Sequence, residues 1–169
     1  MNLRAVAAGV ALAMLTACQS PRFNDTDAAF VHHMVPHHEL GVRMVDAALK
    51  NADDVRVREL AFTMGGYQTS DLFDLRAWRK AWAVPKHSSA IGMLTTDEEA
   101  ELGAAAGAEF DELWLTQMIR HHEGAVSVAG AELDTGQHAR AKATAKRIVK
   151  VQSREITDMR ELLDLLSRE

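Results

Sequence analysis

An internal repeat limits the possible folds of this chain more than any other feature of its sequence. When the 169 residues are shifted against themselves by 84 positions without a gap, two His-His-Glu triplets align, at 37–39 and 121–123. Further aligned pairs are Met34 with Met118, Ala61 with Ala145, Gln68 with Gln152, Asp74 with Asp158 and Arg76 with Arg160. A register kept over this length indicates a duplicated unit, and two copies are too few for a solenoid.

Each copy has the pattern of a helical hairpin. In the first copy, apolar residues recur at steps of three and four from Phe30 to Ala48 and again from Leu60 to Leu75. Turn-forming residues follow the first stretch at 50–53, and their counterparts in the second copy lie at 134–136. Only ten glycines and three prolines occur in the chain, which favours helix over sheet. Two hairpins that close on each other predict an all-α, ferritin-like four-helix bundle.

The bundle is expected to form one domain over residues 25–169. Its expected parts are repeat one at about 25–82, a crossover at 83–107 and repeat two at about 108–169. The crossover contains Thr96-Asp97-Glu98-Glu99, a helix-start signal that predicts one short helix. Pro36 lies inside the first long helix, where it should remove a backbone hydrogen bond and kink the turn.

The first 17 residues look like a secretory signal peptide. Arg4 precedes an apolar run, 5–17, that is too short to span a bilayer comfortably, and Leu-Thr-Ala-Cys at 15–18 is typical of a lipobox. We expect cleavage before Cys18, acylation of its thiol and a short linker at 18–24, so that the domain is an exported lipoprotein in the cell envelope. The membrane would then be contacted only through the lipid anchor. The single cysteine would offer neither a disulfide nor a free thiolate.

Several classes of function lack support in the sequence. The net charge is −5 and no long block of lysine or arginine is present, so a nucleic-acid partner is not expected. No nucleophile with an ordered base, phosphate-binding glycine loop or Cys-x-x-Cys occurs either. Hydrolase, nucleotide-dependent and thiol-redox chemistry are therefore not indicated.

The motif Met-x-x-His-His occurs once in each repeat, inside a predicted helix. The two copies are Met34, His37 and His38 in the first repeat and Met118, His121 and His122 in the second. Residues three and four apart share one face of a helix, so each methionine and its two histidines crowd one patch. Because both copies keep the motif and no thiolate is spare, the pattern predicts metal binding. The two patches face each other across the core or form two separate sites, and the sequence leaves both arrangements open.

The remaining methionines and histidines are more ambiguous. Met44 and Met159 align with aliphatic residues of the other repeat, so core packing and metal ligation remain open for both. His32 and His33 either extend a surface site or have no role. The residues expected to act as core filler or as hydrogen-bonding groups are Met64, His87 and His138.

The character of the ligands selects the metal. Thioether sulfur is a poor ligand for zinc and a good one for copper(I), and imidazole suits copper in both oxidation states. Copper is therefore expected, with copper(I) favoured and copper(II) compatible. Zinc is the weaker alternative and would use histidine with carboxylates. The carboxylates considered for this role are Glu39, Asp71, Glu123 and Glu155.

The same residues carry a resemblance to a known family. Asp-x-x-Phe-x-x-x-Met-x-x-His-His at 27–38, its counterpart at 110–125 and Gln-x-x-Glu-Ile-x-x-Met at 152–159 are similar to the domain-of-unknown-function 305 family. This resemblance implies a ferritin-like bundle, usually exported, with some members that bind copper and take part in copper tolerance. It also implies that both motifs hold ligands and that Met44 occupies a later methionine position. The sequence departs from the family pattern at Val128 and at Gly65-Gly66, where the paired glycines should interrupt the helix.

Three functions follow from these features. The first is a non-enzymatic lipoprotein that binds copper for storage, buffering or tolerance, with a copper-handling protein or a second copy of the chain as further partners. The second is a ferritin-type di-metal oxidase, but such sites use Glu-x-x-His on two helices, and no Glu-x-x-His occurs in the chain. The third is a structural or partner-binding lipoprotein without metal.

Overall fold

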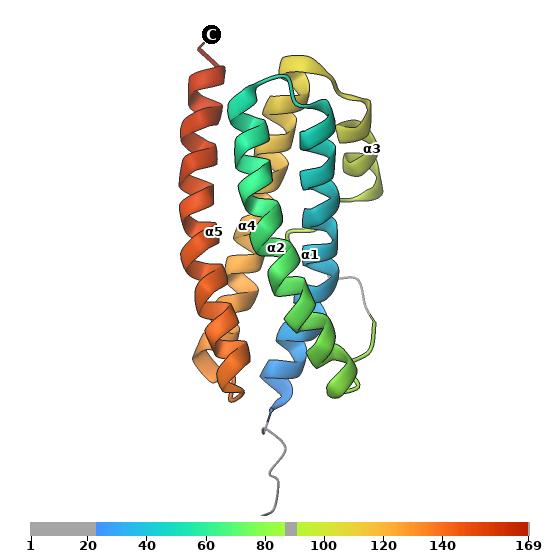
Figure 1. The fold of residues 1–169 in the computed structure, drawn as a ribbon, viewed down its shortest axis with the longest axis vertical. Helices are drawn as coiled ribbons and strands as arrows, with labels where there is room; N and C mark the ends of the chain where they lie inside the picture. The colour runs from blue at the N-terminus through green and yellow to red at the C-terminus, as the bar shows by residue number, and fades with distance from the viewer. Residues whose placement is uncertain (1–22, 87–90, 169) are drawn as a thin grey trace, which may run out of the picture.

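The computed structural model describes residues 23–86 and 91–168, and these two ranges contain helices and no strands. The helices are α1 (Asp25–Asn51), α2 (Val55–Ala81), α3 (Thr96–Ala104), α4 (Gly107–Thr135) and α5 (Ala139–Leu166). Figure 1 shows the four long helices side by side, with short α3 on the outside of the bundle. The predicted all-α four-helix bundle is therefore confirmed.

The duplication is visible in the helices themselves. A shift of 84 residues places α1 on α4 and α2 on α5, with matching turns after Asn51 and Thr135. α1 packs against α2, α4 against α5 and α1 against α4, whereas α2 and α5 make few contacts. The bundle thus has three closed seams and one loose seam, between α2 and α5.

Each hairpin turn is held by an aspartate of the other repeat. The backbone N–H groups of residues 53 and 54 donate to the Asp111 carboxylate at 3.2 and 2.7 Å. In the second hairpin, the N–H groups of residues 137 and 138 donate to Asp27 at 3.2 and 2.8 Å. Donors and acceptors correspond under the shift of 84. Hydrogen bonds to buried carboxylates are among the stronger ones in proteins, so the exchange links the repeats at both ends.

Two sequence features do not break the helices that contain them. α1 continues through Pro36. α2 is one helix from Val55 to Ala81, so the expectation that Gly65-Gly66 interrupts it is wrong. A Cβ atom at Gly65 would lie 3.0 Å from the Val45 side chain, which shows how closely α1 packs there. Such packing stabilises the helix despite the low helix propensity of glycine.

The crossover forms the expected short helix, and the chain just before this helix packs against α4. Thr95 caps α3 in a reciprocal capping box with Glu98, one residue before the predicted start. Upstream of it, Gly92 has a left-handed backbone with φ of 69°. A Cβ atom on Gly124 of α4 would lie 2.7 Å from the Gly92 Cα atom. Only two glycines allow the crossover chain to approach α4 this closely.

The buried apolar residues fall into two clusters along the bundle axis. One cluster lies toward the turn at residue 53 and includes Leu40, Trp114 and Leu162. The other lies toward residue 23 and includes Phe30, Leu75 and Ile148. Between the two clusters, all four long helices place polar side chains inside. Within the described ranges, no helix has both the length and the apolar character needed to cross a bilayer.

Candidate metal centre

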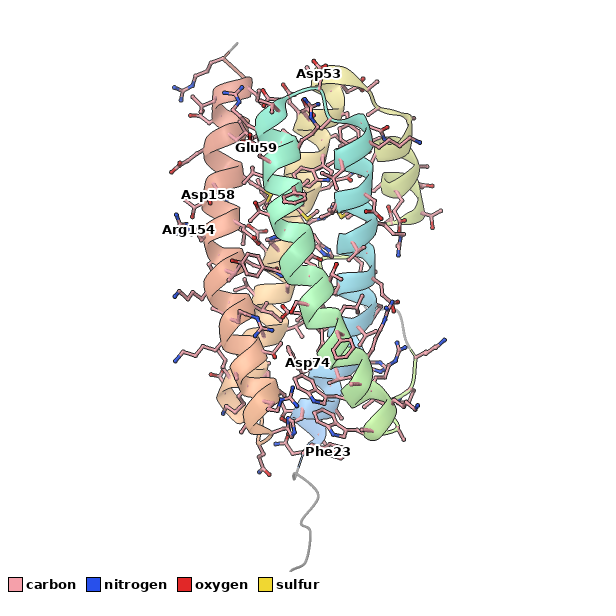
Figure 2. The ribbon with its side chains drawn as sticks, in the orientation of Figure 1. Phe23, Asp53, Glu59, Asp74, Arg154 and Asp158 are labelled. Carbon is pink, nitrogen blue, oxygen red and sulfur yellow. The ribbon has the colours of Figure 1, made fainter. Side chains whose placement is uncertain are left out.

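A layer of buried polar side chains crosses the middle of the bundle, and we call it the central polar layer. It contains His37, His38, Gln68, Asp71, His121, His122, Gln152 and Glu155, each at most 8% exposed. Under the shift of 84 each of these residues corresponds to another member of the layer. The histidines of α1 correspond to those of α4, and the polar residues of α2 correspond to those of α5. Figure 2 draws the side chains that the long helices place between and around their ribbons.

His37 and His121 meet at the centre of the layer. Their rings stack with centroids 3.7 Å apart and planes 17° apart. Burial, together with the neighbouring histidines, holds the pKa of both rings well below the usual value. Both imidazoles are therefore neutral at pH 7, which is the state that binds metal.

Both histidines of the second repeat are oriented by hydrogen bonds. A carbonyl oxygen can only accept, so His121 Nδ1–H donates to the Gly92 carbonyl at 3.1 Å. His122 Nε2–H donates to the Glu155 carboxylate at 2.9 Å. The opposite nitrogens, His121 Nε2 and His122 Nδ1, are buried without a partner. A histidine that donates one ring N–H and keeps the other nitrogen free has the arrangement typical of a metal ligand.

The histidines of the first repeat lack such orientation. His38 Nε2 lies 3.5 Å from the Asp71 carboxylate, beyond normal hydrogen-bond geometry. The other oxygen of Asp71 accepts from the Arg147 guanidinium. Neither ring nitrogen of His37 forms a well-aligned hydrogen bond.

The central polar layer has more buried polar atoms than internal partners for them. The amide of Gln68 lies against Gly41, where any Cβ atom would collide with it, and neither of its polar atoms is hydrogen-bonded. The Oε1 atoms of Gln152 and Glu155 also lack partners. An unsatisfied buried polar atom costs about 1–3 kcal/mol, so such a concentration indicates a place for a ligand. The sequence contained a signal for both glutamines, because they align in the repeat.

The structure separates the methionines that the sequence grouped together. Met118, Met44 and Met159 lie in the apolar cluster toward residue 53, together with Met64. Met34 lies in the other cluster, on the opposite side of the histidines. In that cluster, the positions that correspond to Met44, Met159 and Met64 are occupied by Val128, Leu75 and Ile148. The two histidine pairs therefore meet, whereas the two motif methionines do not.

The remaining candidates lie outside the layer. Glu39 and Glu123 form ion pairs with Arg76 and Arg160 on the neighbouring helices. His138 caps the first turn of α5. The rings of His32 and His33 contact each other edge to face near the surface. Cys18 and His87 lie outside the described residues.

Histidine, cysteine and carboxylate groups do not form a complete metal site by themselves. Within residues 23–86 and 91–168, no three such side chains are grouped closely enough to hold an ion. Carboxylates of the layer also come from only two helices, α2 and α5. A metal ion in the layer would need thioether sulfur as a further ligand, or rotation of the rings.

Comparison with known proteins identifies relatives of the chain. The family described as domain of unknown function (DUF305) matches residues 27–163, and it also matches 5–79. No curated protein matches significantly. A DUF305 protein of Streptomyces coelicolor, described as a candidate secreted protein, is 30% identical with a TM-score of 0.78. The match covers 84% of this chain and 92% of that one.

Two further solved structures show the same fold. A DUF305 fragment from Deinococcus radiodurans is 26% identical with a TM-score of 0.77, covering 85% of this chain and 99% of its own. CopM in the Cu(I)-bound form is 27% identical with a TM-score of 0.70, covering 82% and 95% of the two chains. CopM has also been solved in Cu(II)-bound and silver-bound forms.

Proposed function

The chain belongs to the DUF305 family, and from this premise we propose that it is an exported protein that binds copper(I) in the central polar layer for storage, buffering or tolerance. One observation carries the proposal. The four motif histidines meet in one buried layer, and ring nitrogens of both repeats point to no partner. CopM, which shares the fold, binds copper and silver.

Copper(I) fits the surroundings of the layer better than zinc does. Met44, Met118 and Met159 adjoin the layer on one side and supply thioether sulfur, a soft ligand that zinc does not favour. Neutral imidazoles add no charge to the ligand set, so copper(I) leaves less uncompensated charge in the buried site than a divalent ion would. A ferritin-type oxidase centre would instead need carboxylates from all four helices.

Export and lipidation complete the proposal. The lipobox ending at Cys18 would attach the bundle to a membrane, and α1 begins at Asp25, shortly after it in the sequence. A neighbour in the family is described as a candidate secreted protein. Labelling with a fatty-acid analogue should mark the wild type and not Cys18→Ser. Equal labelling of both would contradict lipidation at this cysteine.

The test of metal binding is a copper(I) titration against a competing chelator, repeated with zinc. The variant replaces His37, His38, His121 and His122 with leucine, which keeps the layer filled with apolar volume. We expect it to lose tight copper binding. His138→Asn is the matched control, since it keeps a capping side chain on α5 and lies outside the layer. Unchanged copper binding in the fourfold variant, or zinc displacing copper(I) from the wild type, would contradict the proposal.

A further inference from the structure

A groove follows the loose seam between α2 and α5. Its volume is about 760 Å³, and its apolar lining includes Leu60 and Val151. Figure 2 shows Arg154 and Asp158 on α5, the helix that forms one wall of the groove. Cavities of this size receive small ligands.

The groove reaches the central polar layer. Glu155 lines the groove, its side chain is almost fully buried, and one of its oxygens accepts the hydrogen bond from His122. The second oxygen of Glu155 is buried without a partner. Arg147, another lining residue, binds Asp71 of the layer. One side chain, Glu155, therefore lies between the groove and His122, and two, Arg147 and Asp71, lie between the groove and His38.

The opposite seam is closed over the same histidines. The crossover chain at Gly92 packs on Gly124 and accepts the hydrogen bond from His121. A Cβ atom at Gly92 would lie 3.0 Å from His37 Nε2. The space beside His37 on the α1–α4 side is thus filled by backbone, which leaves the α2–α5 groove as the more open approach.

The charge of the groove is opposite to what a bare metal cation requires. Its lining contains four cations and two carboxylates: Lys146, Arg147, Lys150, Arg154, Glu155 and Asp158. Lys146 and Lys150 form no ion pair with any described residue. The corresponding positions of α2 are Phe62 and Gly66, so this charge belongs to the second repeat only. Such a wall repels a cation and attracts an anion, in a chain whose net charge is −5.

We propose that copper reaches the central polar layer through the α2–α5 groove, and that it arrives as a small anionic copper(I) complex. This inference rests on the proposed copper binding. Lys146 and Lys150 attract the complex, and the free oxygen of Glu155 marks the inner end of the path. The copper–donor bonds then break, copper bonds to imidazole nitrogen and thioether sulfur form, and copper stays in the +1 state. The released anion returns to solvent, and the neutral imidazoles lose no proton.

The experiment measures the rate of copper uptake from two donors of opposite charge without oxygen. The anionic donor is the copper(I) complex of glutathione, and the cationic donor is tetrakis(acetonitrile)copper(I). The variant is Lys146→Glu/Lys150→Glu, on the exposed rim of the groove. The control, Lys50→Glu/Lys80→Glu, changes the net charge equally at exposed lysines elsewhere. Circular dichroism checks that each variant keeps its helices.

We expect the groove variant to take up copper from the anionic donor about tenfold more slowly, with an effect that shrinks as salt is added. Its uptake from the cationic donor should be unchanged or faster, and its final copper content should equal that of the wild type. Equal slowing of groove variant and control, or equal rates in all three chains, would overturn this route while leaving copper binding intact. A wild type that takes copper from neither donor would overturn the proposed function as well.

Discussion

The His121–His122 pair and the His37–His38 pair share a sequence motif, yet only the first of them is held in place by hydrogen bonds. His121 donates to a carbonyl of the crossover, which passes over the bundle once and therefore serves one repeat. Leu40 occupies the position in α1 that corresponds to Gly124, so no second chain segment could approach there. A duplicated motif therefore does not guarantee a duplicated site.

His122 and His38 differ in how their carboxylate partners hold them, for one reason of reach and one of charge. Glu155 is one methylene longer than Asp71, and it meets His122 at 2.9 Å where Asp71 stays 3.5 Å from His38. Asp71 is also bound by Arg147, whose counterpart in the first repeat is Thr63. A carboxylate shared with a guanidinium is a weaker acceptor for histidine. The second repeat thus offers oriented ligands and the first offers unoriented ones.

The largest expected effect comes from removing one histidine pair at a time. His121→Leu/His122→Leu should weaken copper(I) binding more than about 100-fold, because the oriented ligands are lost. His37→Leu/His38→Leu should weaken copper(I) binding less, about tenfold. In the wild type the rings of His37 and His38 are fixed only when metal binds, and this entropic cost reduces their contribution to affinity. Chelator competition measures both affinities. Equal losses would mean that the two pairs contribute alike despite their different partners.

The next effect isolates the carboxylates behind the histidines. Glu155→Leu should weaken copper(I) binding about 10–100-fold, since outer partners of metal-bound histidines typically contribute this much. Asp71→Leu is the matched variant from the first repeat, and we expect a smaller loss because Asp71 does not hold His38. The same competition assay applies, with thermal unfolding as a check on folding. A greater loss in Asp71→Leu would reverse the assignment of the oriented pair.

The third prediction addresses the glycine contact that occurs in one repeat only. Gly124→Ala should lower the free energy of unfolding by about 1–3 kcal/mol, because the added methyl group meets the Gly92 backbone. Gly66→Ala is the control, since nothing lies within 4 Å of a Cβ atom there. It should be neutral or stabilise α2 by about 0.5–1 kcal/mol. Urea unfolding of the metal-free protein measures both, and similar values would show that the crossover is not in close contact.

The smallest effect concerns Glu132, which stands beside Asp27 and has Ala48 as its counterpart in the first repeat. Burial, together with the Asp27 carboxylate, raises the pKa of Glu132 to about 8. The folded protein thus keeps a proton that the unfolded chain releases above its ordinary pKa of 4.5. This contribution to stability is complete below pH 4.5 and is lost as the pH rises through about 8.

The measurable window lies above about pH 7.5, one unit past the ordinary histidine pKa of about 6.5, where the histidines of the unfolded chain are also mostly neutral. Between about pH 7.5 and 8.5, the wild type should lose at most about 1.4 kcal/mol of unfolding free energy per pH unit. Glu132→Gln should remove most of this slope. Urea unfolding at several pH values tests it, and an unchanged slope in the variant would assign the pH dependence to other groups.

The helices were predictable because their signals are local. Spacings of three and four residues, the turns at 50–53 and 134–136 and the helix start near Thr96 each depend on a few neighbouring residues. The failure at Gly65-Gly66 has the opposite origin. Packing of α1 against α2 outweighs the low propensity of glycine, and that packing is not visible in the local sequence.

By itself, the sequence determined the all-helical duplicated bundle and the set of histidines and methionines available to a metal. It did so because a repeat and a helical period are properties of the chain alone. Tertiary structure decided that Met34 and Met118 lie on opposite sides of the histidines, since α1 and α4 run in opposite directions (Figure 1) and each methionine precedes its histidines by one turn. It also decided which ring nitrogens have partners. Those bonds join residues 29 and 33 positions apart, and tenths of an ångström in side-chain reach separate the two repeats.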